Sequence, residues 1–315
     1  MDVVTVGESM VLLEPEDGES LEHATRFRKR VAGAESNVAI ALARLGHRVS
    51  WISKVGADGF GRYVTKTIRG EGVDVSGVLV DGQKSTGVFF KEHSPAHGRN
   101  VQYYRAHSAA SEMDKSEIDS SVMQSARVFH VTGITPALSL ANRNMILALL
   151  EEARHFGVLI SFDPNIRQKL WPLGKAIPTL AEMANYADVV LPGLDEGEML
   201  TNQTTPEGIA EWFVARGSQI VVVKLGRQGA YFQTENERGY VPGFAVTEVD
   251  EIGAGDAFAA GLLSGLLDSL DIREAVLRAC ALGAIAVCGR GDYETLPNRE
   301  ELSEFMSRRA STVKR

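Results

Sequence analysis

The chain has 315 residues, of which 44% are hydrophobic, and this suffices to build the core of one large α/β domain or two medium ones. Its 33 basic and 41 acidic residues give a formal net charge of −8, which disfavours nucleic acid and anionic membranes as partners. Because no run of about 18 apolar residues and no signal-peptide pattern occurs, we expect no membrane span and a cytoplasmic location.

Two cysteines, Cys280 and Cys288, lie in an alanine-rich stretch that is predicted to be helical. Two thiols in this setting argue against both a disulfide framework and a zinc site. We expect both of them to be small buried hydrophobic side chains.

The first part of the chain alternates between strand and helix patterns. Residues 3–6 are predicted to form a strand, and the helix after it has apolar residues at helical spacing from Val38 to Leu45. A second strand at 49–55 and a second helix at 61–69 complete a βαβα unit. The chain therefore has the pattern of the α/β class.

The pattern changes between residues 78 and 107. Strands are predicted at 86–91 and 101–105 around a polar loop, and with residues 10–13 they can form a small separate sheet. We place the lid strands at about 10–30 and 78–107, inserted into a single domain that spans residues 1–315. A sheet inserted at this point is well placed to act as a lid.

Beyond residue 107 the strand and helix patterns alternate again, and several strands, such as 220–223, are continuous apolar runs. Such runs are typical of strands that helices cover on both faces, so we predict a doubly wound, mostly parallel sheet flanked by helices. Strands are predicted at 128–132, 158–162, 189–191, 220–225 and 230–233, and helices at 142–155, 176–186, 207–216, 255–268, 273–288 and 299–309.

The strand ends are the places to search for a site, because ligands of open α/β sheets bind beyond the carboxyl ends of the strands. Glycines, acids and bases follow several predicted strands, at residues 7–8, 133, 163–167, 192–196 and 224–229. We expect these segments to converge on residues 253–256.

A glycine-lined turn leads into a helix at residues 253–256. Gly253 and Gly255 carry no Cβ, so the N–H groups of Gly253, Ala254 and Gly255 can surround an anion at the helix N-terminus, beside the carboxylate of Asp256. The simpler alternative is a tight strand-to-helix turn with a first-turn charge. The turn is not a dinucleotide fingerprint, because Phe258 occupies the third glycine position, and the chain has no Walker A loop.

The chain resembles the ribokinase-like (PfkB) carbohydrate kinases over nearly its whole length, through the motifs at residues 32–37 and 253–256. Its motifs at 7–10, 103–105, 133–138 and 163–171 are most similar to those of 2-keto-3-deoxygluconate kinases. The resemblance implies transfer of the γ-phosphoryl group of ATP, with Mg²⁺, to a sugar hydroxyl. It also implies that Asp256 is the general base and that the amides of residues 253–255 form the anion hole.

On the substrate side, the resemblance implies that Gly33 and Asn37 contact the sugar. Tyr103 and Arg105 are two residues apart on a strand and so share one face. Arg105 and Arg167 are then the natural pair for an acidic sugar, because a guanidinium fork matches a carboxylate. Either arginine could instead be part of a surface ion pair.

One substitution in the first strand segment favours the same class of substrate. Leu12 stands where fructose- and ribose-type members of the family tend to carry an aspartate that holds sugar hydroxyls. A deoxy, keto, acidic sugar needs fewer such acceptors and more cations.

On the nucleotide side, the resemblance places Lys224, Gly226 and Gly229 beneath ATP and associates Glu196 with magnesium through its waters. No direct protein ligand to the metal is predicted, since Mg²⁺ travels with ATP. The chain departs from the family pattern at Gly193, at Glu251 and at Cys280, which is expected near the adenine. These departures bear on phosphate-side contacts and on any monovalent-ion site.

The histidines give no sign of a nucleophilic or metal site. His130 and His155 are interpreted as structural, and His97 and His107, which flank a lid strand, as solvated loop residues. Residues 290–292 are interpreted as a helix-terminating turn.

The leading interpretation is therefore a kinase of 2-keto-3-deoxygluconate or a close sugar acid. The alternatives are another PfkB kinase such as a fructokinase, or a sensor of sugar acid or nucleotide that has lost turnover. We also expect a homo-oligomer that forms through the exposed edge of the lid sheet.

Overall fold

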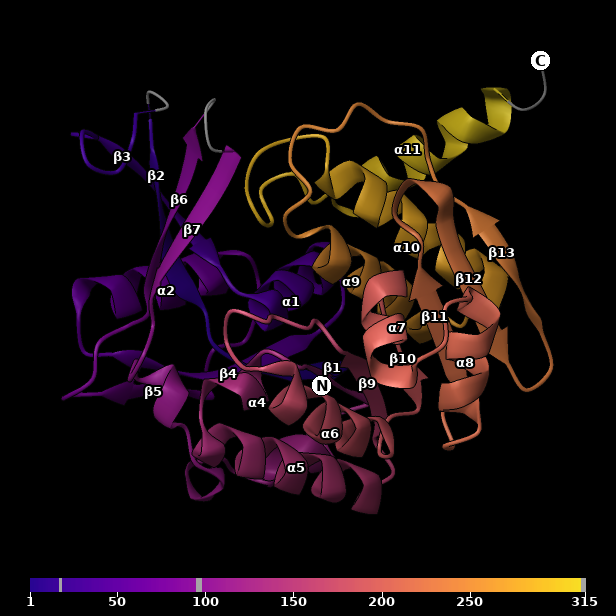
Figure 1. Cartoon of the computed structure of the whole chain (residues 1–315), viewed down its shortest axis with the longest axis horizontal. Helices are drawn as coiled ribbons and strands as arrows, with labels where there is room; N and C mark the ends of the chain where they lie inside the picture. Colours follow the sequence, from indigo (N-terminus) through magenta and orange to yellow (C-terminus); the bar gives the residue numbers. More distant parts are fainter. Residues whose placement is uncertain (17–18, 95–97, 313–315) are drawn as a thin grey trace.

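A large sheet and a smaller one make up the protein, whose computed structural model describes residues 1–16, 19–94 and 98–312. The large sheet has nine strands in the order β13-β12-β11-β10-β9-β8-β1-β4-β5 (Figure 1). All neighbours from β11 to β5 are parallel, and β12 and β13 continue the sheet antiparallel. In sequence order these strands are β1 Val3–Val6, β4 Val49–Gly56, β5 Val78–Asp81, β8 Val128–Thr132, β9 Leu159–Asp163, β10 Val189–Val190, β11 Ile220–Lys224, β12 Gly229–Thr234 and β13 Arg238–Pro242.

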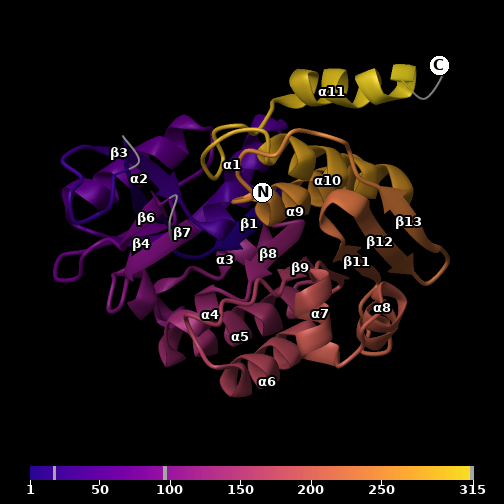
Figure 2. The same ribbon diagram turned by 45° about the horizontal axis from the view of Figure 1, so that its top comes forward.

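Helices cover both faces of the large sheet, which confirms the predicted doubly wound, mostly parallel architecture. Figure 2 shows α9, α10 and α11 on one side of the strands and α5 and α6 on the other. The helices are α1 Ala34–Arg44, α2 Gly59–Gly70, α3 Ser121–Gln124, α4 Thr135–Leu138, α5 Leu140–His155, α6 Leu173–Ala184, α7 Leu194–Thr201, α8 Pro206–Val214, α9 Ala254–Leu267, α10 Ile272–Ala286 and α11 Arg299–Thr312.

The lid is a four-stranded sheet in the order β3-β2-β6-β7, which stands beside the carboxyl ends of the parallel strands (Figure 1). β2 pairs parallel with β6, and the other two pairs are antiparallel. The strands are β2 Met10–Pro15, β3 Phe27–Ala32, β6 Val88–Ser94 and β7 Gly98–Tyr104. The lid is thus built from two separate segments of the chain.

The predicted lid range differs from the observed sheet at one end. Val78–Asp81 forms β5, which pairs parallel with β4 of the large sheet, so the second lid segment begins only at Val88. The strand lies where a βαβ crossover from β4 through α2 adds a parallel neighbour. Of the loop predicted between the two later lid strands, residues 95–97, including His97, lie outside the described residues.

Several short elements have no counterpart in the sequence prediction, among them α3, α4, α7 and β13. β13 is a short edge strand interrupted by Gly239, and α7 has only eight residues, so neither carries a long hydrophobic period. α7 begins at a capping box in which the Glu196 side chain accepts from the N–H of Gly193.

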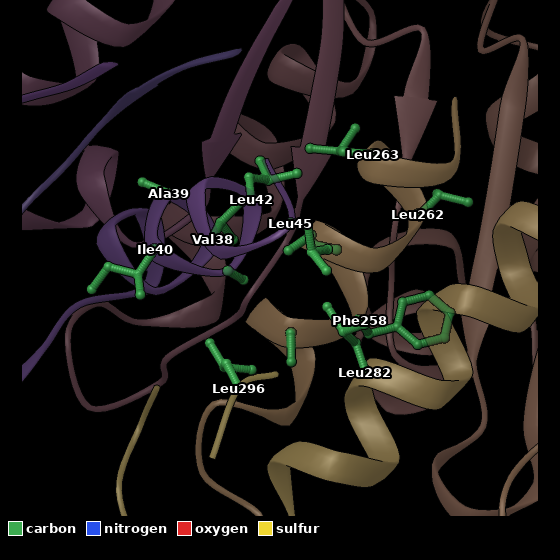
Figure 3. Close-up of a cluster of buried hydrophobic side chains, with 14 of the residues drawn as sticks. Val38, Ala39, Ile40, Leu42, Leu45, Phe258, Leu262, Leu263, Leu282 and Leu296 are labelled. Carbon is green, nitrogen blue, oxygen red and sulfur yellow. The ribbon is translucent and has the colours of Figure 1, made fainter. Parts of the chain in front are cut away.

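The core on the α9 side fixes the position of this helix. Val38 and Leu42 of α1, with Leu45 directly after it, pack with Phe258 and other apolar residues of α9 and α10 (Figure 3). A Cβ on Gly261 of α9 would lie 2.7 Å from the Cα of Ala279 in α10, so the two helices are in close backbone contact. The small residues of α9 therefore allow it to pack closely against α10, which fixes the position of the helix.

No helix within the described ranges is both long and apolar enough to cross a membrane. Cys280 is buried on α10 as expected, but Cys288 is exposed, because α10 ends at Ala286 and the chain leaves the core there.

Candidate active site

A cavity of about 1070 Å³ lies between the lid and the carboxyl ends of the parallel strands. Its walls come from the lid, from the ends of β9 and β11, from the start of α9 and from α10. Every residue that the sequence analysis assigned to the site lines this cavity: Gly33, Asn37, Tyr103, Arg105, Arg167, Glu196, Lys224, Gly226, Gly229, Gly253, Ala254, Gly255, Asp256 and Cys280. Several of the segments that follow the predicted strands thus meet at one cavity.

Asp256 lies in the first turn of α9, where the helix N-terminus faces the cavity. Gly253 is the N-cap with φ 76°, and a Cβ there would lie 2.3 Å from the carbonyl oxygen of Asp292. Only glycine fits this left-handed position without strain. The amide N–H groups of the first turn have no acceptor within the helix; that of Ala254 donates to the carbonyl of Glu251 (3.3 Å), and the helix N-terminus as a whole still presents positive potential to an anion in the cavity.

Burial sets the acidity of Asp256, which is 9% exposed. Loss of solvation raises the pKa of its carboxyl to about 7, and the nearby carboxylates of Asp163 and Asp292 raise it as well. A hydrogen bond from Asn37 Nδ2 to Asp256 Oδ2 (2.8 Å) and the charge of Arg167 act in the opposite direction. A carboxyl with this pKa can take up a proton near neutral pH, as a general base must.

A second buried carboxyl, Asp292, lies beside the first, and the sequence analysis missed it. Asn37 Nδ2 also donates to Asp292 Oδ2 (3.4 Å), so one amide spans both acids. Burial raises the pKa of Asp292 to about 7. Residues 290–292 do follow a helix, as interpreted, but the turn places Asp292 in the site. Nothing in the spacing signals this, because Asn37 and Asp292 are 255 residues apart.

Lys224 places a cation next to the start of α9. It ends β11, and its Nζ donates to Asp163 Oδ2 (2.7 Å) at the end of β9. Burial by itself would lower the pKa of Lys224, but the carboxylates of Asp163 and Glu196 more than offset this and raise it. A Cβ on Gly255 would lie 3.7 Å from Lys224 Nζ, so the ammonium group and the helix N-terminus adjoin one another. The ammonium group of Lys224 and the N-terminus of α9 together could bind a phosphate group.

Glu196 joins two loops at the cavity wall. Its Oε2 accepts from the N–H of Gly193 (2.8 Å), and its Oε1 accepts from the N–H of Ile166 (2.9 Å). The carboxylate is therefore engaged by backbone amides, and its association with magnesium through water stays a prediction.

The rest of the nucleotide side is a glycine turn facing α10. Gly226 and Gly229 have φ of 56° and 103°, and a Cβ on Gly229 would lie 2.0 Å from the carbonyl oxygen of Val241. Both glycines are thus required by the turn itself. Cys280 of α10 and the exposed Glu251 also line the cavity.

The two arginines predicted to bind an acidic sugar differ in their surroundings. Arg105 is 8% exposed, and its Nε donates to Oε2 of the buried Glu8 (2.7 Å). Arg167 is exposed at the cavity and makes no ion pair within the part of the chain that the structure describes. The alternative of an ion pair therefore holds for Arg105, although the pair is buried, whereas Arg167 has a guanidinium available for a ligand.

The lid wall of the site is aromatic. Tyr103 stacks on Phe89 with ring centroids 5.5 Å apart, and the guanidinium of Arg105 lies 5.6 Å from the Tyr103 ring. Met10 lines the same wall, while Leu12 is buried in the small apolar cluster of the lid. This wall offers apolar surface with few hydroxyl acceptors.

Gly33 is needed by the protein itself. It is extended, and a Cβ there would lie 2.5 Å from the carbonyl oxygen of Glu8 and 2.7 Å from Oγ of Ser9. Close approach to a sugar remains a prediction, because the β1–β2 turn alone explains this glycine.

The histidines in the described chain have local roles. His130 is buried in β8 with Nδ1 3.0 Å from Ser161 Oγ, and burial lowers its pKa to about 3, so it is neutral. His155 ends α5 against Phe156, and His107 is exposed. The structural interpretation of His130 and His155 agrees with these contacts.

A family model described as pfkB family carbohydrate kinase matches residues 1–299. The chain belongs to this family. It is 43% identical over 310 residues to 2-dehydro-3-deoxygluconokinase of Bacillus subtilis (strain 168), covering 98% of this chain and 96% of that protein. The match thus extends over nearly the whole of both carbohydrate kinases.

Solved structures agree with the fold of this pfkB kinase. A PfkB protein from Polaromonas sp. JS666 is 44% identical, with a TM-score of 0.89 over 96% of this chain and 99% of that one. A putative ribokinase II from E. coli, solved in complex with ATP and Mg²⁺, is 28% identical, with a TM-score of 0.91 over 98% and 99% of the two chains.

Proposed function

We propose that this carbohydrate kinase uses ATP with Mg²⁺ to phosphorylate 2-keto-3-deoxygluconate, also called 2-dehydro-3-deoxygluconate, or a close keto-deoxy sugar acid. The observation that carries the choice of substrate is Arg167, an exposed guanidinium at the cavity without an ion pair in the described chain. The similarity to a 2-dehydro-3-deoxygluconokinase supports the same choice.

The residues at the start of α9 fit the phosphates of ATP. The glycine-lined turn leaves room beside the helix N-terminus, and Lys224 adds a cation next to it. When bound, Mg²⁺ neutralises negative charge on the phosphates. The chain supplies the remaining positive potential through the amides of residues 253–255 and through Lys224.

Asp256 then acts as the general base. Its carboxylate accepts the proton of the sugar hydroxyl as that oxygen attacks the γ-phosphorus, and Asn37 holds the carboxylate in orientation. Because phosphoryl transfer depends mainly on positioning and charge stabilisation, a buried carboxylate beside a helix N-terminus provides what the reaction needs.

The acidic end of the sugar lies toward Arg167. A guanidinium offers two parallel N–H donors to a carboxylate, whereas Arg105 already gives donors to Glu8. In this arrangement Arg167 binds the carboxylate, and Arg105 with Tyr103 shapes the lid wall. A neutral ketohexose would leave Arg167 without a partner.

A coupled ADP-release assay with purified enzyme tests the proposal. We expect a higher kcat/KM for 2-keto-3-deoxygluconate than for D-fructose or D-ribose at saturating MgATP. Turnover of neutral sugars without turnover of the sugar acid would identify another PfkB activity, such as fructokinase. Binding of sugar acid without any ADP release would instead support a sensor that has lost turnover.

We also infer a homo-oligomer formed through the lid. The lid sheet ends in edge strands β3 and β7, and an edge can pair with another chain. The exposed Tyr104 on β7 (63%) adds apolar surface at this edge. Light scattering during size-exclusion chromatography tests this inference, and the mass of a monomer would contradict it.

A further inference from the structure

A buried lysine joins the lid to the loop that precedes α9. Lys91 is in β6, a central strand of the lid, and it is on the same face as Phe89, which lines the cavity. Its Nζ donates to Oδ2 of Asp250, and each residue is only 4% exposed. Neither side chain lines the cavity, so the pair lies behind the wall of the site.

Asp250 is directly connected to the anion hole. It precedes Gly253 by three residues, and its Oδ1 also accepts from the N–H of Ile252 (3.3 Å). The loop is held on its other side by the N–H of Val249, which donates to the carbonyl of Val287 after α10 (2.7 Å). A displacement of Asp250 would therefore move the residues whose amides face the cavity.

The neighbouring loop is tied to the lid in a similar way. Arg30 of β3 lies 3.5 Å from Glu294, two residues after Asp292. Because Gly253 packs against the carbonyl of Asp292, the two tied loops touch each other beside Asp256. The lid is thus connected to both loops that surround the base, and the more deeply buried connection is Lys91 with Asp250.

Stability alone does not explain a buried pair at this position. The free-energy cost of removing two charges from water offsets most of their attraction. Apolar residues of similar volume at such a position often stabilise a protein equally or more. A buried pair does keep its two groups within hydrogen-bond reach, because separating them would leave two uncompensated charges inside the protein.

We propose that Lys91 is a positioning residue, which holds Asp250 so that the lid and the anion-hole loop are placed together for phosphoryl transfer. This inference rests on the proposed function only in that the enzyme must phosphorylate some sugar. Lys91 does not line the cavity, so we expect it to contact neither substrate.

The test compares the parent with Lys91→Met and with the double variant Lys91→Met/Asp250→Asn, which removes both charges of the pair. We expect kcat to fall about 10²-fold in both, as a misplacement near 1 Å can produce, while the KM of ATP and of the sugar change by less than about threefold. Lys91→Arg, which keeps the charge, should recover at least about tenfold of the lost kcat.

Hydrogen exchange separates positioning from a loss of fold. Amides of residues 250–256 should exchange faster in the double variant, while those of β8 and β9 stay unchanged. Lys54→Met is the matched control, because Lys54 of β4 forms ion pairs with Glu117 (2.7 Å) and Asp81 (3.6 Å), and none of these three residues lines the cavity. We expect parental kcat from that variant.

The inference would be wrong if the double variant kept the parental kcat, even with a lower melting temperature. If Lys91→Met alone does not fold, the kcat of the double variant still tests the inference. The ratios are measured with whichever sugar the parent phosphorylates. A parent that is inactive on the sugar acid would thus contradict the proposed substrate without affecting this test.

Discussion

The two sheets of this kinase contribute opposite walls of one cavity and are stabilised differently. The large sheet is enclosed by two extensive clusters of buried apolar residues, whereas the apolar cluster of the lid consists of Met10, Leu12, Ala32 and Phe89 with Val101 beside it. Buried ion pairs, Arg105 with Glu8 and Lys91 with Asp250, connect the lid to the rest of the chain.

This difference suggests a division of tasks. The wall formed by α9 and the strand ends carries Asp256, the proposed base, and Lys224 beside the helix N-terminus, so a change at Asp256 should affect kcat, whereas a change at Arg167 should affect affinity for the sugar acid. The lid wall is placed by ion pairs: loss of the Arg105–Glu8 pair should affect affinity and stability together, whereas loss of the Lys91–Asp250 pair should lower kcat through the anion-hole loop. Substitutions on each side test whether the two walls have these separate roles.

The largest effect is expected from Asp256→Asn on the α9 wall. The variant removes the base, and since removal of a single stabilising donor already lowers kcat by about 10²–10³, we expect a loss of at least about 10³-fold. ATP affinity, measured by calorimetry, should change little. Parental turnover in this variant would exclude Asp256 as the base.

The next effect is expected from Arg167→Ala. Loss of a charge-assisted hydrogen bond of about 1.5–3 kcal/mol should raise KM for the sugar acid by roughly 10- to 100-fold. The control is Arg143→Ala, which removes a surface pair with Glu182 and should leave KM unchanged. If KM for neutral sugars rises equally, Arg167 has a structural role instead.

A smaller effect on catalysis is expected from Glu8→Gln at the lid. It leaves the Arg105 guanidinium buried without a counter-charge, which typically destabilises by about 3–5 kcal/mol. Ile146→Ala in α5 should lower the melting temperature by a similar amount, because buried aliphatic truncations cost about 2–5 kcal/mol. Only Glu8→Gln should also raise KM for the sugar. A parental KM in both variants would contradict the role given to the lid wall.

The smallest effect is one of stability. The Asp292 carboxyl has a folded pKa of about 7 against an ordinary value of 3.8, so the folded state holds its proton more tightly. Its contribution is therefore favourable below about pH 4, is lost as pH rises toward 7, and is fully unfavourable above that. Asp292→Asn should raise the melting temperature at pH 8 by roughly a few degrees and leave it nearly unchanged at pH 4. An equal shift at both pH values would show that burial does not perturb this carboxyl.

Local rules explain which features the sequence predicts. The doubly wound, mostly parallel sheet follows from the alternating patterns. The convergence of several segments follows from the strand ends, since the residues after β9 and β11 and at the start of α9 all reach one cavity. Glycines at 253 and 229 signal their turns because no other residue adopts those angles easily.

What the sequence could not predict are contacts between distant positions. Glu8 and Arg105 are 97 residues apart, and Lys91 and Asp250 are 159 apart, so no local pattern relates them. The pairing of β5 was missed for a different reason: a strand of four residues carries too little pattern to indicate which of the two sheets it joins. Charge partners in this protein depend on the tertiary fold.

The dependence of kcat/KM on pH tests most directly whether Asp256 is a base tuned by its burial. At saturating MgATP, we expect kcat/KM for the sugar acid to fall below an apparent pKa of about 7, which belongs to the coupled pair of Asp256 and Asp292. In Asp292→Asn this limb should move to lower pH, because the charge of Asp292 raises the pKa of Asp256. A profile that is flat from about pH 5 to 8, or a limb that Asp292→Asn leaves in place, would contradict the assignment.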